Sequence, residues 1–159
     1  MKNLKFSRLF AALMFVAVLG LTGCKPEADK AEPKAIEGTW VNDAEKYEIT
    51  SSTYKNYYAV AGEYYLYYST KDIVITEIDE TSGILYGKFD DATHIGFGAE
   101  VGQWYALYYF DLTDTSVKLL QAFKVGGKAG CDTLEEAKAE YTIDNGYFPT
   151  GAASVCTKK

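Results

Sequence analysis

Short runs of aromatic and β-branched residues, separated by turn residues, follow one another between positions 36 and 125. This texture is typical of strands joined by tight turns. Alternation supports it, because Tyr47 and Ile49 fall on one side of an extended chain while Lys46 and Glu48 fall on the other. We predict strands over 36–41, 46–51, 54–60, 64–69, 72–79, 83–90, 103–112 and 116–125.

The regular spacing and short connections favour antiparallel neighbours in up-and-down order. Closing such a sheet removes both exposed edges. The fold class we predict is therefore mainly β, an antiparallel up-and-down β-barrel of about eight strands with one short C-terminal α-helix. Residues 36–159 form this domain, including the helix and a C-terminal arm, and Tyr147-Phe148 is a candidate short final strand.

The helix is predicted where the period of the sequence changes. Asp132 or Thr133 can cap its N-terminus. Leu134, Ala137 and Tyr141 follow at helical spacing and form one apolar stripe.

The first 23 residues have the pattern of a secretory signal peptide. Lys2, Lys5 and Arg8 precede an apolar run that is shorter than the roughly 20 residues of a spanning helix. Leu21-Thr22-Gly23-Cys24 resembles the lipobox of bacterial lipoproteins. The resemblance implies cleavage before Cys24, a thioether-linked lipid on its sulfur and acylation of the new amine.

A lipid-anchored protein of the bacterial cell envelope is thus expected. Residues 24–35 would be the lipidated cysteine and a flexible tether, since they are charged and contain two prolines. Lys25 follows the cysteine, which in enteric-type lipoproteins favours the outer membrane over the inner membrane.

The two remaining cysteines, Cys131 and Cys156, would be exported to an oxidising compartment. An even pair there is expected to form a disulfide, with free thiols or a metal pair as the alternatives. Metal binding has little support, because His94 is the only histidine in the chain.

Charge excludes one class of partner. The chain has 16 basic and 22 acidic residues, and Arg8, its only arginine, leaves with the signal peptide. An acidic domain without arginine is a poor nucleic-acid binder, so no nucleic-acid partner is expected.

Gly38-Thr39-Trp40 at the start of the first strand resembles the lipocalin and wider calycin pattern. The resemblance implies that Trp40 closes one end of the barrel. The segment Gly38 to Asn42 also resembles the first strand of avidins, in which the asparagine position touches biotin. Avidins line their pocket with several tryptophans, whereas Trp104 is the only other tryptophan here.

Tyrosine is the outlier of the composition, with 14 residues. An inward set could line a cavity for a small ligand, and an outward set could form a recognition surface, while tyrosine is also simply a good strand former. The candidate wall residues for a ligand are Tyr47, Tyr65, Tyr67, Trp104 and Tyr108.

The longest irregular segment, 92–102, contains three glycines together with apolar residues. It is either a lid at the barrel mouth or a hairpin linker whose apolar residues tuck under the barrel. His94 within it is a candidate metal or haem ligand, but a lone histidine beside glycines is more often exposed.

No nucleophile–base arrangement or paired acid is recognisable, so no catalytic residue, enzyme activity or cofactor is predicted. The function we expect is non-catalytic binding of a small apolar or amphipathic ligand inside the barrel. The alternative is a surface interaction or adhesion lipoprotein with a filled barrel, which contacts host or envelope macromolecules, proteins or glycans, through exposed tyrosines.

Overall fold

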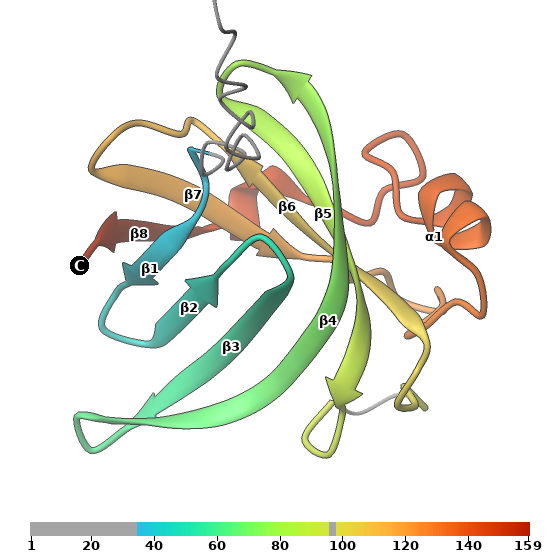
Figure 1. The fold of residues 1–159 in the computed structure, drawn as a ribbon, viewed down its shortest axis with the longest axis horizontal. Helices are drawn as coiled ribbons and strands as arrows, with labels where there is room; N and C mark the ends of the chain where they lie inside the picture. The colour runs from blue at the N-terminus through green and yellow to red at the C-terminus, as the bar shows by residue number, and fades with distance from the viewer. Residues whose placement is uncertain (1–34, 96–97) are drawn as a thin grey trace, which may run out of the picture. The chain divides into compact units, whose positions relative to one another are not determined.

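The computed structural model describes residues 35–95 and 98–159. It contains eight strands that form one closed antiparallel barrel in sequence order, with β1 pairing β8 (Figure 1). The predicted fold class is confirmed. The strands are β1 (Gly38–Val41), β2 (Glu45–Ile49), β3 (Thr53–Val60), β4 (Glu63–Asp79), β5 (Ser82–Asp91), β6 (Trp104–Phe110), β7 (Ser116–Gln121) and β8 (Ser154–Lys158).

All eight strands and the buried core lie between residues 36 and 158. The barrel therefore has a complete core and a closed hydrogen-bond ladder of its own, which is what an independently folding domain needs. Among the described residues, no helix has the length and apolar character needed to cross a bilayer. The predicted signal peptide, Cys24 and almost all of the tether lie outside the described residues.

Two predicted strands, 64–69 and 72–79, are one long strand, β4. The expected turn at Thr70-Lys71 is a bulge, in which the register with β5 shifts between Lys71 and Val74. Asp72 adopts a φ of 56°, a conformation that aspartate tolerates better than most residues. A bulge bends a strand without ending it, so the prediction of a turn was wrong.

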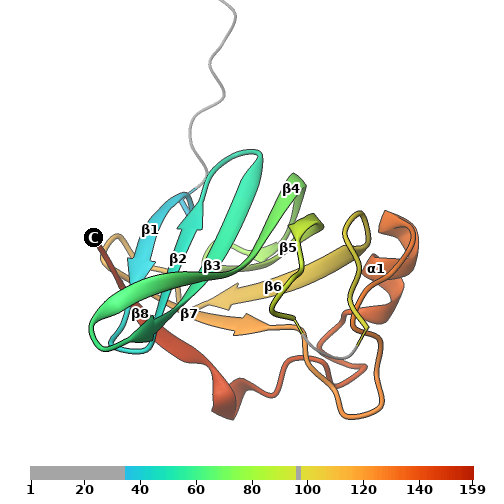
Figure 2. The ribbon, with the colours of Figure 1, turned by 90° about the horizontal axis from the view of Figure 1, so that it is seen from below.

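The eighth strand is also different from the predicted one. β8 lies in the C-terminal arm, where it pairs with β7 and β1 and closes the barrel. Figure 2 shows this arm running alongside β7 before it joins β1. Tyr147 and Phe148 are buried but belong to the irregular connection rather than to a strand.

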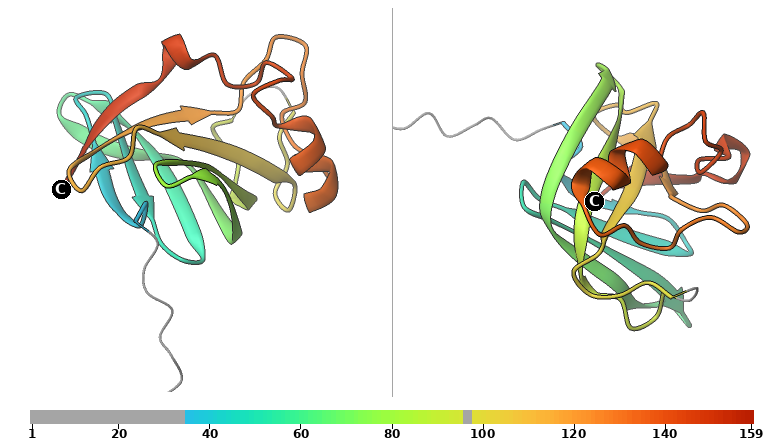
Figure 3. Two further views of the ribbon diagram at one scale, coloured as in Figure 1. Left: turned by 90° about the horizontal axis from the view of Figure 1, so that it is seen from above. Right: turned by 90° about the vertical axis from the view of Figure 1, so that its right-hand side faces the viewer.

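The short helix α1 (Leu134–Glu140) begins as expected. The Thr133 hydroxyl accepts a hydrogen bond from the Glu136 amide at 3.1 Å, and the Glu136 carboxylate in turn accepts one from the Asp132 amide. Ala137 and Tyr141 are fully buried, which confirms the apolar stripe. Figures 1 and 3 show α1 outside the barrel, beside β5 and β6.

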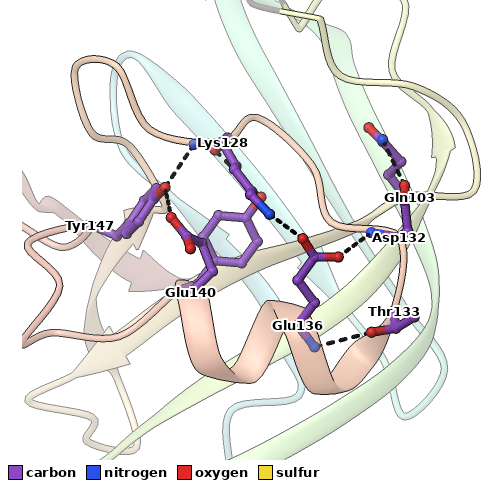
Figure 4. Close-up of polar contacts among 8 residues, drawn as sticks. Gln103, Lys128, Asp132, Thr133, Glu136, Glu140 and Tyr147 are labelled. Carbon is purple, nitrogen blue, oxygen red and sulfur yellow. Dashed lines mark hydrogen bonds and ion pairs between the residues drawn. The ribbon is translucent and has the colours of Figure 1, made fainter.

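Polar contacts tie α1 to the connections around it (Figure 4). Lys128 contacts Glu136, and the Tyr147 hydroxyl donates to the Glu140 carboxylate and accepts from the Lys128 amide. The Lys128 ammonium lowers the pKa of the Glu136 carboxyl. Helix and C-terminal connection are thus one layer over the outer face of the barrel.

The predicted disulfide is not formed, and Cys131 and Cys156 are both free and buried. Cys131 bridges Trp104 at the start of β6, whereas Cys156 lies opposite Val117 near the start of β7. Because β6 and β7 are antiparallel, these two positions are separated by roughly 20 Å along the strands. The arm continues past the helix into β8, which carries the second cysteine away from the first.

Candidate functional site

One end of the barrel gathers polar and aromatic side chains on its inner face. At this end, called the mouth here, the even-numbered strands begin and the connections 92–103 and 122–153 emerge. The register pairs Glu45 with Tyr58 and Tyr47 with Asn56, while Tyr58 also pairs with Tyr65. Adjacent strands β2, β3 and β4 therefore present their side chains together at the mouth.

A bulge in the pairing of β3 with β4 shapes this wall. The register shifts between Asn56 and Tyr57, so that Asn56 opposes Tyr68 while Tyr57 opposes Leu66. Tyr67 is the extra residue, and its ring centroid lies 5.8 Å from that of Tyr68. The bulge thereby turns Tyr67 towards Tyr58, at a centroid distance of 6.0 Å.

These side chains surround a hollow of about 320 Å³, the mouth pocket, lined by Glu45, Asn56, Tyr58, Tyr67 and His94. Its size is at the lower end of the range for small-molecule sites. His94 is exposed at its rim and belongs to the 92–102 connection. The pocket thus combines one carboxylate, one amide, two phenol rings and, at its rim, one imidazole.

Gln121 of β7 reaches across the barrel beneath this pocket. Its Nε2 lies 3.3 Å from the Tyr47 hydroxyl, 3.4 Å from Glu45 Oε1 and 3.4 Å from Asn56 Oδ1. The second oxygen of Glu45 accepts a hydrogen bond from the Ser154 hydroxyl. The floor of the pocket is therefore a connected polar network held by four strands.

Three buried polar atoms of this region have no hydrogen-bond partner in the described protein: Asn56 Nδ2, Tyr54 Oη and Tyr68 Oη. Asn56 is only 1% exposed. An unsatisfied buried donor costs roughly 1–3 kcal/mol, so such atoms point to a bound water or ligand.

Burial also controls the ionisation of the interior phenols. It raises the pKa of Tyr54 and Tyr68 well above 10, and neighbouring phenols raise it further. Burial and then the Glu45 carboxylate raise the pKa of Tyr47. These hydroxyls stay protonated at neutral pH, so they are available as hydrogen-bonding groups and do not act as bases.

Below the mouth the barrel is filled by aromatic rings. Tyr68, Phe89 and Tyr105 contact one another at centroid distances of 4.9 to 5.8 Å. The Tyr105 hydroxyl donates to the Ala122 carbonyl at 2.7 Å. The site is consequently a shallow pocket over a packed core rather than a deep calyx.

The structure brings together three of the five predicted wall residues. Tyr47 is on the pocket floor, Tyr67 lines the pocket, and Tyr65 lies at the rim, where it is 46% exposed and packs against Tyr58. Trp104 and Tyr108 lie on the outer face of β6, so the structure places them away from this pocket.

The two predicted wall residues on the outer face of β6 are both covered by other parts of the protein. Trp104 pairs with Cys131, and the Tyr108 ring lies 5.0 Å from Phe110 and 5.4 Å from Phe148. Trp40 is fully buried, and its indole Nε1–H donates to the Ile36 carbonyl at 2.8 Å. Its role in closing the barrel stays a prediction.

Sequence reasoning missed Glu45, Asn56, Tyr58 and Gln121. One signal was available for Asn56, because it stands between Tyr54 and Tyr58 on the same face of a strand. A polar amide within an inward aromatic row indicates a polar interior. Glu45 and Gln121 meet only across the closed barrel, which no local pattern reveals.

A second hollow, the loop groove, lies beside the mouth and has a volume of about 370 Å³. It is lined mainly by the connection 123–129, with Ile95 and Tyr105. Ile95 is partly buried there, while its neighbour His94 borders the mouth pocket. The 92–102 connection thus touches both hollows.

Residues 35–95 and 98–159 contain no group of three or more histidine, cysteine or carboxylate side chains placed so that they could hold a metal ion. Comparison with protein-family models, with curated proteins and with solved structures finds no match for this chain.

Proposed function

We propose that the protein is a lipid-anchored envelope lipoprotein whose barrel binds a small amphipathic molecule at its mouth without chemical change. The sequence at Cys24 supports the anchor, and its neighbour Lys25 favours the outer membrane. Two or more acyl chains would make membrane attachment stable where one would be marginal.

The anchor is tested by changing Cys24 to Ser in the full chain. The expected product is an unprocessed precursor, because neither lipid attachment nor the subsequent cleavage can occur. Normal cleavage of the variant, together with membrane association that survives washing with salt, would refute lipidation at Cys24.

The observation that carries the binding proposal is the unpartnered Nδ2 of Asn56 at the edge of the mouth pocket. A ligand with an acceptor atom would satisfy this donor. Another part of the ligand would lie against the rings of Tyr58 and Tyr67, which border the same hollow. The polar floor orients the ligand, and the packed core below limits its depth.

Binding is tested by native mass spectrometry of the barrel domain after mild purification. The expected wild-type spectrum contains a retained small-molecule adduct. Tyr58→Ser removes a pocket wall and should lose the adduct. Tyr57→Ser is the matched control, because this adjacent tyrosine lies on the outer face, where its hydroxyl donates to Glu48 at 2.7 Å. A clean apo mass for the wild type would weigh against binding of a small molecule.

A second candidate function is supported by the exposed residues of the β3–β4 hairpin. Tyr58, Val60 and Tyr65 are 38%, 50% and 46% exposed and lie close together in the pairing of β3 with β4. Such a patch suits contact with a protein or glycan of the envelope or host. An apo native mass together with glycan-array binding that Tyr65→Ser abolishes would favour this function.

A further inference from the structure

The mouth pocket contains a carboxylate that no cationic side chain of the described residues neutralises. Glu45 accepts hydrogen bonds from the neutral groups Gln121 and Ser154. Five ion pairs among the described residues lie elsewhere: Lys46–Glu48, Lys71–Asp90, Lys88–Asp72, Lys118–Asp111 and Lys128–Glu136. A half-buried carboxylate beside a pocket favours a cation in that pocket.

The nearest lysine in sequence faces away from the pocket. Lys46 follows Glu45 in β2 and therefore points to the outer side of the sheet. There its Nζ lies 2.8 Å from Glu48 and 3.8 Å from the centroid of the Tyr57 ring. The described residues that line the pocket include no lysine, and the exposed His94 at its rim forms no ion pair with Glu45.

Tyrosine rings provide the second element of a cation site. The rings of Tyr58 and Tyr67 stand nearly perpendicular, at 88°, and Tyr65 lies 6.0 Å from Tyr58. Aromatic faces attract ammonium groups, as Lys46 over Tyr57 shows on the outer side of the same wall.

The third element is independent of charge. Asn56 Nδ2 is buried at the pocket and lacks a partner, so it calls for an acceptor oxygen on the ligand. An anionic ligand would satisfy Asn56 but would meet the Glu45 carboxylate. An amine that also carries a hydroxyl or carbonyl group would satisfy both residues.

We propose that the mouth pocket binds a small organic amine in its cationic form, with the ammonium between Glu45 and the rings of Tyr58 and Tyr67 and an acceptor oxygen on Asn56. This inference rests on the proposed binding function and specifies its ligand class. Uptake or delivery of such amines at the envelope would need no chemistry beyond binding.

The test compares three probes that share a hexyl chain: hexylammonium, hexan-1-ol and hexanoate. Each is titrated at neutral pH and low salt into the barrel domain, which contains its own complete core, and affinity is read from NMR shifts. We expect hexylammonium to bind at least about fivefold more tightly than the other two. Added salt should weaken hexylammonium while leaving hexan-1-ol unchanged.

Glu45→Gln should abolish the preference for the cation, so that this variant binds hexylammonium no more tightly than hexan-1-ol. Glu48→Gln is the matched control, because this carboxylate lies on the outer side of the same strand. Tyr67→Leu, which keeps an apolar wall, should weaken hexylammonium more than hexan-1-ol. Thermal unfolding would show that each variant is folded. The salt series uses only the wild-type protein, so it tests the proposal even if a variant does not fold.

The outcomes separate the two proposals. Equal or tighter binding of hexan-1-ol or hexanoate at the mouth would overturn the amine inference while the binding function stands. Absence of binding by all three probes would overturn both.

Discussion

The two sides of the barrel bury their tyrosines in different ways. The strands β2 and β3 fully bury residues of their inner face only, and their outer side carries the partly or fully exposed side chains of Lys46, Glu48 and Lys55. In β6, Trp104 to Tyr109 are buried throughout, because α1 and the C-terminal connection cover the outside. The doubly covered side supplies stability, and the singly covered side leaves polar groups available at the mouth.

This comparison explains which predictions from sequence succeeded. On β2 the alternation of Tyr47 with Lys46 and Glu48 identifies the inner face. On β6 both faces are apolar, so the choice of Trp104 and Tyr108 over Tyr105 had no support from alternation. The outer face of β6 is apolar because it packs against α1, which begins more than twenty residues after the strand ends.

The interior phenols give the largest expected effect, and both sides contribute to it. In the unfolded chain Tyr54, Tyr68 and Tyr105 ionise near pH 10, whereas burial raises their pKa in the fold. Folded protein therefore binds more protons than unfolded protein above pH 10. Stability is complete below that pH and falls as the pH rises through the folded pKa values.

Urea denaturation across alkaline pH measures this loss. The double substitution Tyr54→Phe and Tyr68→Phe should reduce the slope of stability against pH, with the remainder coming from Tyr105 and from other buried groups whose pKa is raised, such as Tyr47 and Cys156. A stability that stays constant as the pH rises from 10 into the strongly alkaline range would contradict the described burial of these phenols.

The second prediction contrasts one core position with one rim position. Leu107 is fully buried in β6, so Leu107→Ala should cost about 3 kcal/mol of unfolding free energy. Val60→Ala, at a position that is 50% exposed, should change it by less than about 0.5 kcal/mol. Similar losses in chemical denaturation would show that the rim is as tightly packed as β6.

A third prediction separates satisfied from unsatisfied phenols. Tyr105→Phe removes the hydrogen bond to the Ala122 carbonyl and should cost about 1 kcal/mol. Tyr68→Phe removes a hydroxyl without a described partner and should be neutral or slightly stabilising. A clear destabilisation by Tyr68→Phe in urea titrations would indicate a partner, such as a buried water.

The smallest effect is expected from reduction. Since Cys131 and Cys156 are free, the intact mass should be unchanged by a reducing agent and both thiols should label only on unfolding. Burial, followed by the Glu45 charge, raises the pKa of Cys156 to about 12, which also keeps its thiol unreactive. A mass gain of two hydrogens on reduction would instead show that the two cysteines form the disulfide expected from the sequence.

Local signals were sufficient for most strands, the helix cap at Thr133 and the apolar stripe to Tyr141. They failed at Asp72, where a bulge imitates a turn, and at β8, whose short sequence becomes a strand only between β7 and β1. Local signals did not predict the pocket for the same reason as β8, because Glu45, Asn56 and Gln121 meet only when the barrel closes.

The most direct test of the central claim asks which hollow binds a small molecule. Backbone NMR shifts of the barrel domain titrated with hexylammonium and hexan-1-ol would locate the site. We predict shifts at Glu45, Asn56, Tyr58 and Tyr67, with none specific to the loop groove at 123–129. Shifts centred on that groove, or none at all, would contradict a binding site at the mouth.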